Sequence, residues 1–205
     1  MMLSTIAKLK AHLGIPAADT SKDAKLTTIL SGASTYIEGQ TARKFAAQVH
    51  RLKLSGDGSD ELVLPQYPIV NAGTDADPDP AITTLKLDGV DILAEIAAGT
   101  IEVDLEAGIL YRENDWREDK RNIEIVYSAG FSLPSDESGE SGVSAGNVPE
   151  DLEMAVLRLA ARIYERSTAE GVQSVSAGSF STTYKDAVDE DIKQTIARHS
   201  RLRVG

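Results

Sequence analysis

Hydrophobic residues recur every three or four positions at both ends of the chain. This spacing predicts two helices within the first 45 residues, because it places apolar side chains on one helix face: Leu3, Ile6, Leu9 and Leu13 in the first, and Leu26, Ile29, Leu30, Ala33 and Ile37 in the second. It predicts two more after Pro149, with Leu152, Val156, Leu159 and Ile163 in one and Val188, Ile192 and Ile196 in the last. Helices this short are marginal alone, so we expect them to pack together.

Between about Val49 and Tyr127 the hydrophobic period changes to two. This alternation predicts strands, and Asp88-Gly89 predicts a tight hairpin turn between two of them. Polar residues at the alternate positions indicate an antiparallel sheet with one face in solvent. Strands and helices do not alternate along the chain, which argues against a Rossmann-like or barrel enzyme fold.

Together these patterns predict an α+β protein. Its helical core has about four helices, two N-terminal and two C-terminal, and an antiparallel β-rich subdomain is inserted between the two pairs. The expected parts are N-terminal core helices at 1–48, the β-rich insertion at 49–131, a flexible acidic Ser/Gly loop at 132–147, and C-terminal core helices with a tail at 148–205.

Composition narrows the chemistry of the 205-residue chain. It has no cysteine, which excludes disulfides, thiolate metal ligands and cysteine nucleophiles. Lys and Arg number 21 against 32 Asp and Glu, a net charge of −11, so we do not expect the chain to coat nucleic acid or an anionic membrane. Apolar stretches are only a few residues long and no signal peptide is recognisable, so we expect a soluble protein.

One segment matches the sequence pattern of a catalytic motif. Gly142-Val-Ser144-Ala-Gly146 matches a nucleophile elbow, and Asp189 and His199 are possible triad partners. That motif works on a strained turn between a strand and a helix, whereas here it lies in a low-complexity loop. We attribute the match to composition and keep a hydrolase using Ser144 as a remote alternative.

A metal site is weakly indicated. Asp75, Asp77 and Asp79 match the first positions of a calcium loop, but Pro80 replaces the required Gly and Lys86 the final Glu. The three histidines, His12, His50 and His199, lack metal-ligand spacing. We therefore expect no enzyme activity, no catalytic residue, no cofactor and no metal.

Two features remain open from the residues alone. Trp116 lies among charged residues and could be a surface anchor or partly buried against the sheet. From Ile192 to Gly205 the chain has bases and no acids. These bases could complement the helix C-terminus or form an arm that docks to a partner.

Several short motifs are each weak signals, but their order along the chain is distinctive. Thr41-Ala-Arg43-Lys-Phe45 ends the second helix, Tyr67-Pro68-Ile69-Val70 and Tyr127-Ser-Ala129-Gly130 lie in the β segment, and Val148-Pro149-Glu150-Asp151-Leu152 opens the third helix. In this order and spacing, nearly the whole chain resembles the head–tail connector (adaptor) proteins of long-tailed bacteriophages and gene transfer agents.

The resemblance implies a structural virion protein. It implies a ring, usually of 12 copies, that lies under the portal, connects the capsid to the neck and tail, and lets genomic DNA pass without specific binding. The implied partners are the portal protein and a downstream neck, stopper or tail-completion protein, with no membrane. The implied location is the virion neck, after synthesis in the host bacterial cytoplasm. The alternative is another phage neck, tail-completion or packaging-associated structural protein.

The resemblance also implies that the C-terminus reaches the portal. Arginines can form paired hydrogen bonds to carboxylates, and leucine and isoleucine side chains can anchor a docked segment. The predicted portal-binding residues are Ile192, Lys193, Ile196, Arg198, Arg201, Leu202 and Arg203.

Overall fold

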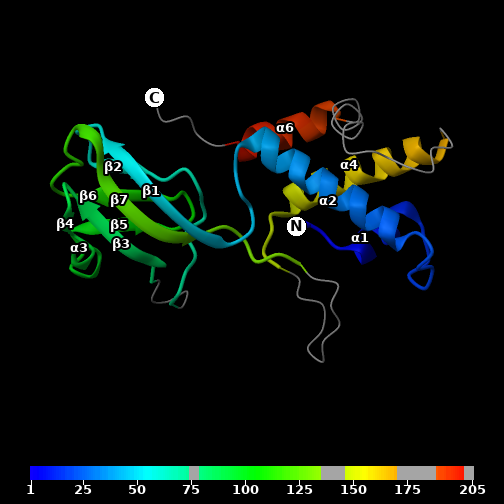
Figure 1. Cartoon of the computed structure of the whole chain (residues 1–205), viewed down its shortest axis with the longest axis horizontal. Coiled ribbons are helices and arrows are strands. Elements are labelled where there is room, and N and C mark those ends of the chain that lie inside the picture. Colours follow the sequence, from blue (N-terminus) through cyan, green and yellow to red (C-terminus); the bar gives the residue numbers. More distant parts are fainter. Residues whose placement is uncertain (74–78, 135–145, 170–187, 201–205) are drawn as a thin grey trace. The chain divides into compact units, whose positions relative to one another are not determined.

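The computed structural model describes residues 1–73, 79–134, 146–169 and 188–200 (Figure 1). It divides into two compact units. The helical unit joins Met1–Phe45 to Ser132–Arg201, and the β unit comprises Ala46–Phe131. The helices and antiparallel sheets confirm the predicted α+β class. Most of the loop predicted at 132–147 lies outside the described residues.

The helical unit contains α1 (Ile6–Leu13), α2 (Asp23–Thr41), α4 (Glu150–Ala169) and α6 (Glu190–His199). Helix α1 begins where the Thr5 hydroxyl accepts a hydrogen bond from the Lys8 backbone N–H at 3.2 Å. It ends at Gly14, whose positive φ of 67° suits a residue without a Cβ. No helix among the described residues is both long and apolar enough to cross a membrane.

Helix α4 is the centre of this unit and contacts α1, α2 and α6. Its buried residues occupy much more than one stripe: Leu152, Ala155, Val156, Leu157, Leu159, Ala160, Ala161 and Ile163. Polar bonds fix the chain near α1 to the start of α4, because Glu153 accepts from Ser4 Oγ at 2.9 Å and from Lys8 Nζ at 2.8 Å. Residues before and after the β unit therefore share one core.

The β unit contains two antiparallel sheets. One has the order β1 (Gln48–Gly56), β7 (Asp119–Ala129), β3 (Ile82–Leu87) and β4 (Val90–Asp91). The other has the order β2 (Glu61–Val63), β6 (Ile109–Arg112) and β5 (Ile101–Asp104). The predicted hairpin at Asp88-Gly89 is confirmed, with φ of 53° and 81° at these residues, both in the left-handed region that a tight hairpin turn requires.

The strands form two sheets that pack against each other, rather than the single sheet that we expected. Apolar residues from both sheets form one core, including Leu62, Ile101 and Leu110 from the shorter sheet and Leu85 and Ile125 from the longer one. Short strands cannot bury their apolar face without a partner layer, and the second sheet supplies it. The short helix α3 (Ala94–Ala97) was not predicted, because its four residues are too few to show a period.

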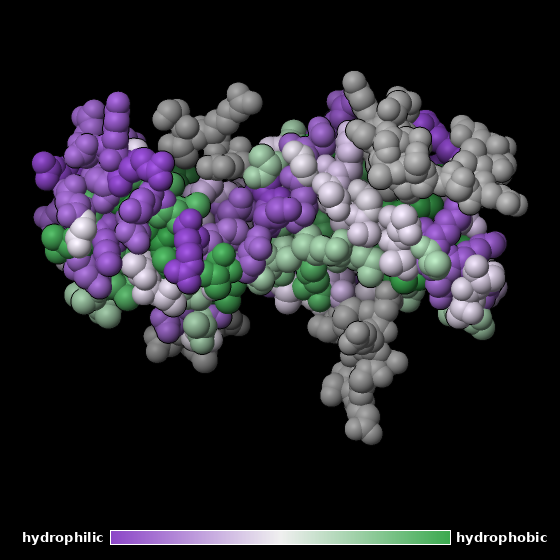
Figure 2. Space-filling view, viewed as in Figure 1, coloured by the Kyte–Doolittle hydropathy of each residue, from purple (hydrophilic) through white to green (hydrophobic). Residues whose placement is uncertain are grey.

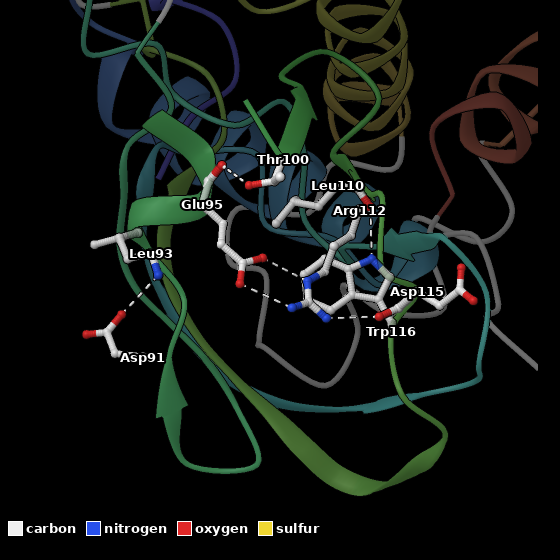
Figure 3. Close-up of polar contacts among 8 residues, drawn as sticks. All are labelled: Asp91, Leu93, Glu95, Thr100, Leu110, Arg112, Asp115 and Trp116. Atoms are coloured by element: carbon white, nitrogen blue, oxygen red, sulfur yellow. Dashed lines mark hydrogen bonds and ion pairs between the residues drawn. The ribbon is translucent and has the colours of Figure 1, made fainter. Parts of the chain in front are cut away.

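Trp116 is fully buried in this core, so it is not a surface anchor. Its indole Nε1 donates to the Leu110 carbonyl at 3.2 Å (Figure 3). The Arg112 guanidinium lies 5.7 Å from the centre of the indole ring and is held by Glu95, with Nε–Oε2 and Nη2–Oε1 distances of 2.9 and 3.2 Å. Arg112 also donates to the Asp115 carbonyl at 3.0 Å. This network connects α3, β6 and the loop before β7.

We expect Trp116→Ala to destabilise the β unit by about 3–5 kcal/mol, because it removes a large, fully buried side chain. Urea unfolding followed by far-ultraviolet circular dichroism measures the loss. Trp116→Phe, which keeps an aromatic ring and loses the Nε1 hydrogen bond, should cost less. Equal midpoints for the wild type and the alanine variant would contradict the packing described here.

Candidate docking surface on the helical unit

Helix α6 carries most of the described residues of the predicted docking segment. Asp189 precedes it and accepts a hydrogen bond from the Ile192 backbone N–H at 3.0 Å, which caps the helix. This bond, followed by the charges of Arg162 and Arg158, keeps the pKa of Asp189 below its ordinary value. Ile192 is 1% exposed, so its side chain attaches α6 to the helical core.

Ion pairs between α4 and α6 flank this apolar contact. Arg162 pairs with Asp189, and Arg158 Nη1 lies 3.4 Å from Asp191 Oδ2. At the other end of α6, Asp151 on α4 receives both Arg198 Nη1 at 2.8 Å and His199 Nε2 at 3.0 Å. Helix α6 is thus fixed to α4 at both of its ends.

Asp151 is the polar anchor of the α6 C-terminus. Burial raises the pKa of its carboxyl, but hydrogen bonds from His199, Arg198 and the Leu152 backbone N–H outweigh burial and bring the pKa below its ordinary value of 3.8. The carboxylate therefore stays ionised in mildly acidic solution and can hold the basic end of α6.

Residues at the end of α2 complete this anchor. Arg43 donates to the His199 carbonyl at 3.3 Å, which places a cation at the negative end of the α6 dipole. The Phe45 ring meets the His199 ring edge-on, with their centroids 6.4 Å apart. Glu38 accepts from the Phe45 backbone N–H at 3.1 Å. The Thr41-Ala-Arg43-Lys-Phe45 motif therefore supports the C-terminal helix.

A shallow groove runs between α4 and α6. Its lining combines apolar and charged groups: Asp151, Met154, Ala155, Arg158, Asp191, Ile192 and Thr195. Met154 is 37% exposed, which is unusual for α4, where most apolar side chains are buried. This groove and the exposed side of α6 form the candidate docking surface.

The predicted portal-binding residues occupy different environments. Ile192 is buried and Ile196 is half-buried, whereas Lys193 and Arg198 are exposed. Lys193 pairs with Glu190 at 3.3 Å and Arg198 with Asp151. Arg201, Leu202 and Arg203 lie outside the described residues. Their role in docking stays a prediction.

Two other motifs from the sequence meet inside the β unit. The Gly130 backbone N–H donates to the Pro68 carbonyl at 2.9 Å, and Ile69 and Ala129 form a β-bridge. The Tyr127 hydroxyl donates to the Gln66 carbonyl at 3.2 Å. The Tyr-Pro-Ile-Val and Tyr-Ser-Ala-Gly segments therefore hold each other in place.

The catalytic and metal candidates are not assembled in the described part of the chain. His199 contacts Asp151, whereas Asp189 caps α6 and pairs with Arg162, and Ser144 is outside the described residues. Asp75 and Asp77 are also outside them. Among residues 1–73, 79–134, 146–169 and 188–200, no three acidic, histidine or cysteine side chains are grouped to hold a metal.

Asp151→Asn should destabilise the helical unit at neutral pH by removing the charge that binds Arg198 and His199. Since the pKa of Asp151 is lowered in the folded state, its stabilisation is present above pH 3.8 and is lost as the pH falls through the lowered value. The difference in thermal midpoint between wild type and variant should therefore shrink on acidification from pH 7 to below 3.

Asp191→Asn provides the matched control. It removes the same charge from a side chain that is 74% exposed and that pairs with Arg158 at the longer distance of 3.4 Å. Solvent screens such an exposed pair, so we expect a small effect on stability at both pH values. A destabilisation by Asp151→Asn that is equally large in acid would show that its charge is not the anchor.

Comparisons with known proteins match this chain in two ways. Residues 121–199, from within β7 to the end of α6, match the sequence model of the phage gp6-like head-tail connector protein family. A chain in the neck of an empty gene transfer agent particle, computed with C6 symmetry, is 25% identical with a TM-score of 0.53. The match covers 99% of this chain and 92% of that chain.

A chain in the virion of a native gene transfer agent particle is 23% identical with a TM-score of 0.53, over the same shares of 99% and 92%. No curated protein matches. The family match covers most of β7 together with α4 and α6, and the structural match extends the similarity to the rest of the chain. The resemblance predicted from the sequence is thus confirmed: residues 121–199 match the head-tail connector family, and nearly the whole chain is similar to a chain in the neck of a gene transfer agent particle.

Proposed function

We propose that this chain is a structural head–tail adaptor that forms part of the virion neck. The observation that carries the proposal is the match over 99% of its length to a chain in the neck of a gene transfer agent particle. The head-tail connector match at residues 121–199 supports the same role from sequence. The role is mechanical and needs interfaces rather than a reaction centre.

In this proposal the subunits form a closed ring, for which 12 copies is the number that the resemblance implies. Ring closure needs two different patches on each subunit, one for each neighbour. The helical parts at 1–48 and 148–205 form the core of each subunit, and the insertion at 49–131 adds a second surface. The helices fix α6 in place, so that the C-terminus can bind the portal. A neck, stopper or tail-completion protein binds on the opposite side of the ring.

Charge is distributed in a way that suits a DNA conduit. Residues 46–131 contain 17 acids and 7 bases, so this segment carries −10 of the total charge of −11. Figure 2 shows hydrophilic residues over much of the visible surface of the β unit. An acidic protein repels phosphate, whereas a basic lumen would retain the passing duplex. DNA then passes without specific binding.

The role itself is tested by locating the chain in particles. Gold or antibody labelling of the N-terminally tagged full chain should mark the junction between head and tail. Cells that lack the chain should produce heads that leak DNA or stay without tails. Label on the capsid shell or along the tail, with normal junctions in its absence, would contradict the adaptor role.

Portal docking requires a mild variant, because α6 is part of the core. A chain ending at Asp191 would lose the buried Ile192 and the partners of Asp151, so loss of binding would not distinguish docking from misfolding. We instead expect Arg201→Ala with Arg203→Ala to leave the far-ultraviolet spectrum unchanged and to weaken binding to purified portal protein about tenfold. The remaining affinity should depend less on salt than that of the wild type.

Lys22→Ala with Lys120→Ala is the matched control. It also removes two positive charges, from exposed sites outside the C-terminal segment. If both double variants weaken portal binding equally, the effect is one of net charge. If neither does, the C-terminal arm is not the docking segment.

A further inference from the structure

The longer sheet of the β unit ends in two different strands. Its order is β1-β7-β3-β4, so within the described residues β1 and β4 each have a strand neighbour on one side only. Every pairing in the sheet is antiparallel, and β4 therefore runs opposite to β1. If β4 of one subunit lay beside β1 of the next, the antiparallel order would simply continue. Edge strands readily pair with other chains in this way.

A row of charged side chains crosses all four strands of this sheet. Lys53 on β1 is paired in register with Glu124 on β7, Glu124 with Lys86 on β3, and Lys86 with Asp91 on β4. We call this the charge row. Its signs alternate from strand to strand, and Lys53 Nζ lies 3.6 Å from Glu124 Oε2. Opposite charges at directly paired positions stabilise a sheet, and like charges destabilise it.

The two ends of the charge row are complementary to each other. It begins with a lysine at the β1 edge and finishes with an aspartate at the β4 edge, and both residues are exposed. If the charge row continues from one subunit into the next, contact between two β1 edges opposes lysines and contact between two β4 edges opposes aspartates. Only a junction of β4 with β1 continues the alternation. The row therefore favours a head-to-tail contact, which is the kind that closes a ring.

A row of apolar residues lies next to the charge row and crosses the same four strands. Leu54, Ile123, Leu87 and Val90 are paired in register across the same four strands. Val90, at the β4 edge, is 65% exposed, the largest value among the exposed large hydrophobic residues of the described chain. In a β4–β1 junction that puts Lys53 opposite Asp91, Val90 comes to lie opposite Leu54. This contact would remove apolar surface from water on both subunits.

Other charges near the two edges agree with this polarity. Arg51 is a second exposed base on β1. Beside β4, the exposed Asp88 occupies the hairpin turn and is 3.0 Å from Arg117. Strand β4 and its turn contain only acidic charges, and β1 contains only basic ones.

We propose that β4 of one subunit packs against β1 of the next copy of this chain. In this junction Asp91 pairs with Lys53 and Val90 covers Leu54. The proposal rests on the proposed ring and identifies one of its contacts. Because β4 is only two residues long, side chains contribute most of the junction and the backbone contributes little.

Cysteine cross-linking tests the contact directly, because the natural chain has no cysteine. The full-length chain with Ser55→Cys and Val90→Cys is treated with a short bismaleimide, both purified at rising concentration and in assembled particles. We expect a ladder of covalent oligomers. Neither single variant should be cross-linked, because the proposed junction brings Ser55 near Val90 and not near a second Ser55. The pair Ser55→Cys with Tyr111→Cys, which replaces the β4 site by one on the other sheet, should not form a ladder.

Reversal of the charge row tests its polarity. Lys53→Glu introduced into the cross-linking pair should reduce ladder formation about tenfold, since it places like charges at the junction. The variant Lys53→Glu, Lys86→Glu, Glu124→Lys and Asp91→Lys reverses the complete row and restores alternation within each subunit. It should form ladders with itself but not with tagged wild-type chain. Far-ultraviolet dichroism and thermal midpoints establish that each variant is folded.

The outcomes separate this contact from the ring itself. Rings seen by electron microscopy without a Ser55–Val90 ladder would overturn the β4–β1 contact and leave the adaptor role intact. Dimers from Ser55→Cys alone would also overturn it, because they require two β1 edges to meet. Free mixing of reversed and wild-type chains would show that the charge row does not direct the junction. Absence of any higher oligomer, alone or in particles, would overturn both proposals.

Discussion

Burial of α4 is the interaction on which the helical unit depends. Most of its circumference is covered, and among its exposed positions are Met154, Arg158 and Glu165. An ordinary surface helix buries one stripe and needs only one neighbour. Helix α4 needs several, and they come from both sides of the β unit along the chain: α1 and α2 precede it and α6 follows it. The helical core is therefore discontinuous in sequence.

This arrangement explains why the β unit is built as a self-sufficient body. Its two sheets bury Trp116, Leu110 and Ile125 in a core of their own, and the Pro68–Gly130 hydrogen bond joins segments near its ends. Because it has its own core, the β unit can carry a high net charge and open edge strands without stabilisation by the helices. In the proposed adaptor role this separates two tasks, because one unit stabilises the subunit and the other supplies additional surface.

Several polar contacts in the helical unit position α6. Asp189 caps the first turn of α6. In its last turn, Asp151 binds the side chains of Arg198 and His199, and Arg43 donates to the His199 carbonyl. Each exposed ion pair contributes little to stability by itself. Their joint effect, together with the buried Ile192, is to orient a helix whose C-terminal end leads into the basic tail. In the proposed docking to the portal, such a support reduces the conformational freedom that is lost on binding.

The sequence by itself determined the elements and their class. Apolar residues at every third or fourth position identified the helices around Leu26–Ile37 and Leu152–Ile163. Apolar residues at every second position identified the strands around Leu52 and Ile125, because each period reflects which face of the element is apolar. Motif order identified the family resemblance. The tertiary structure alone decided which faces meet. No local pattern relates Asp151 to Arg198, which meet only through the packing of α6 on α4. None relates Lys53 to Asp91, which belong to one row across the sheet only through strand register. For the same reason the division of the strands into two sheets and the complete burial of Trp116 emerged only from the fold.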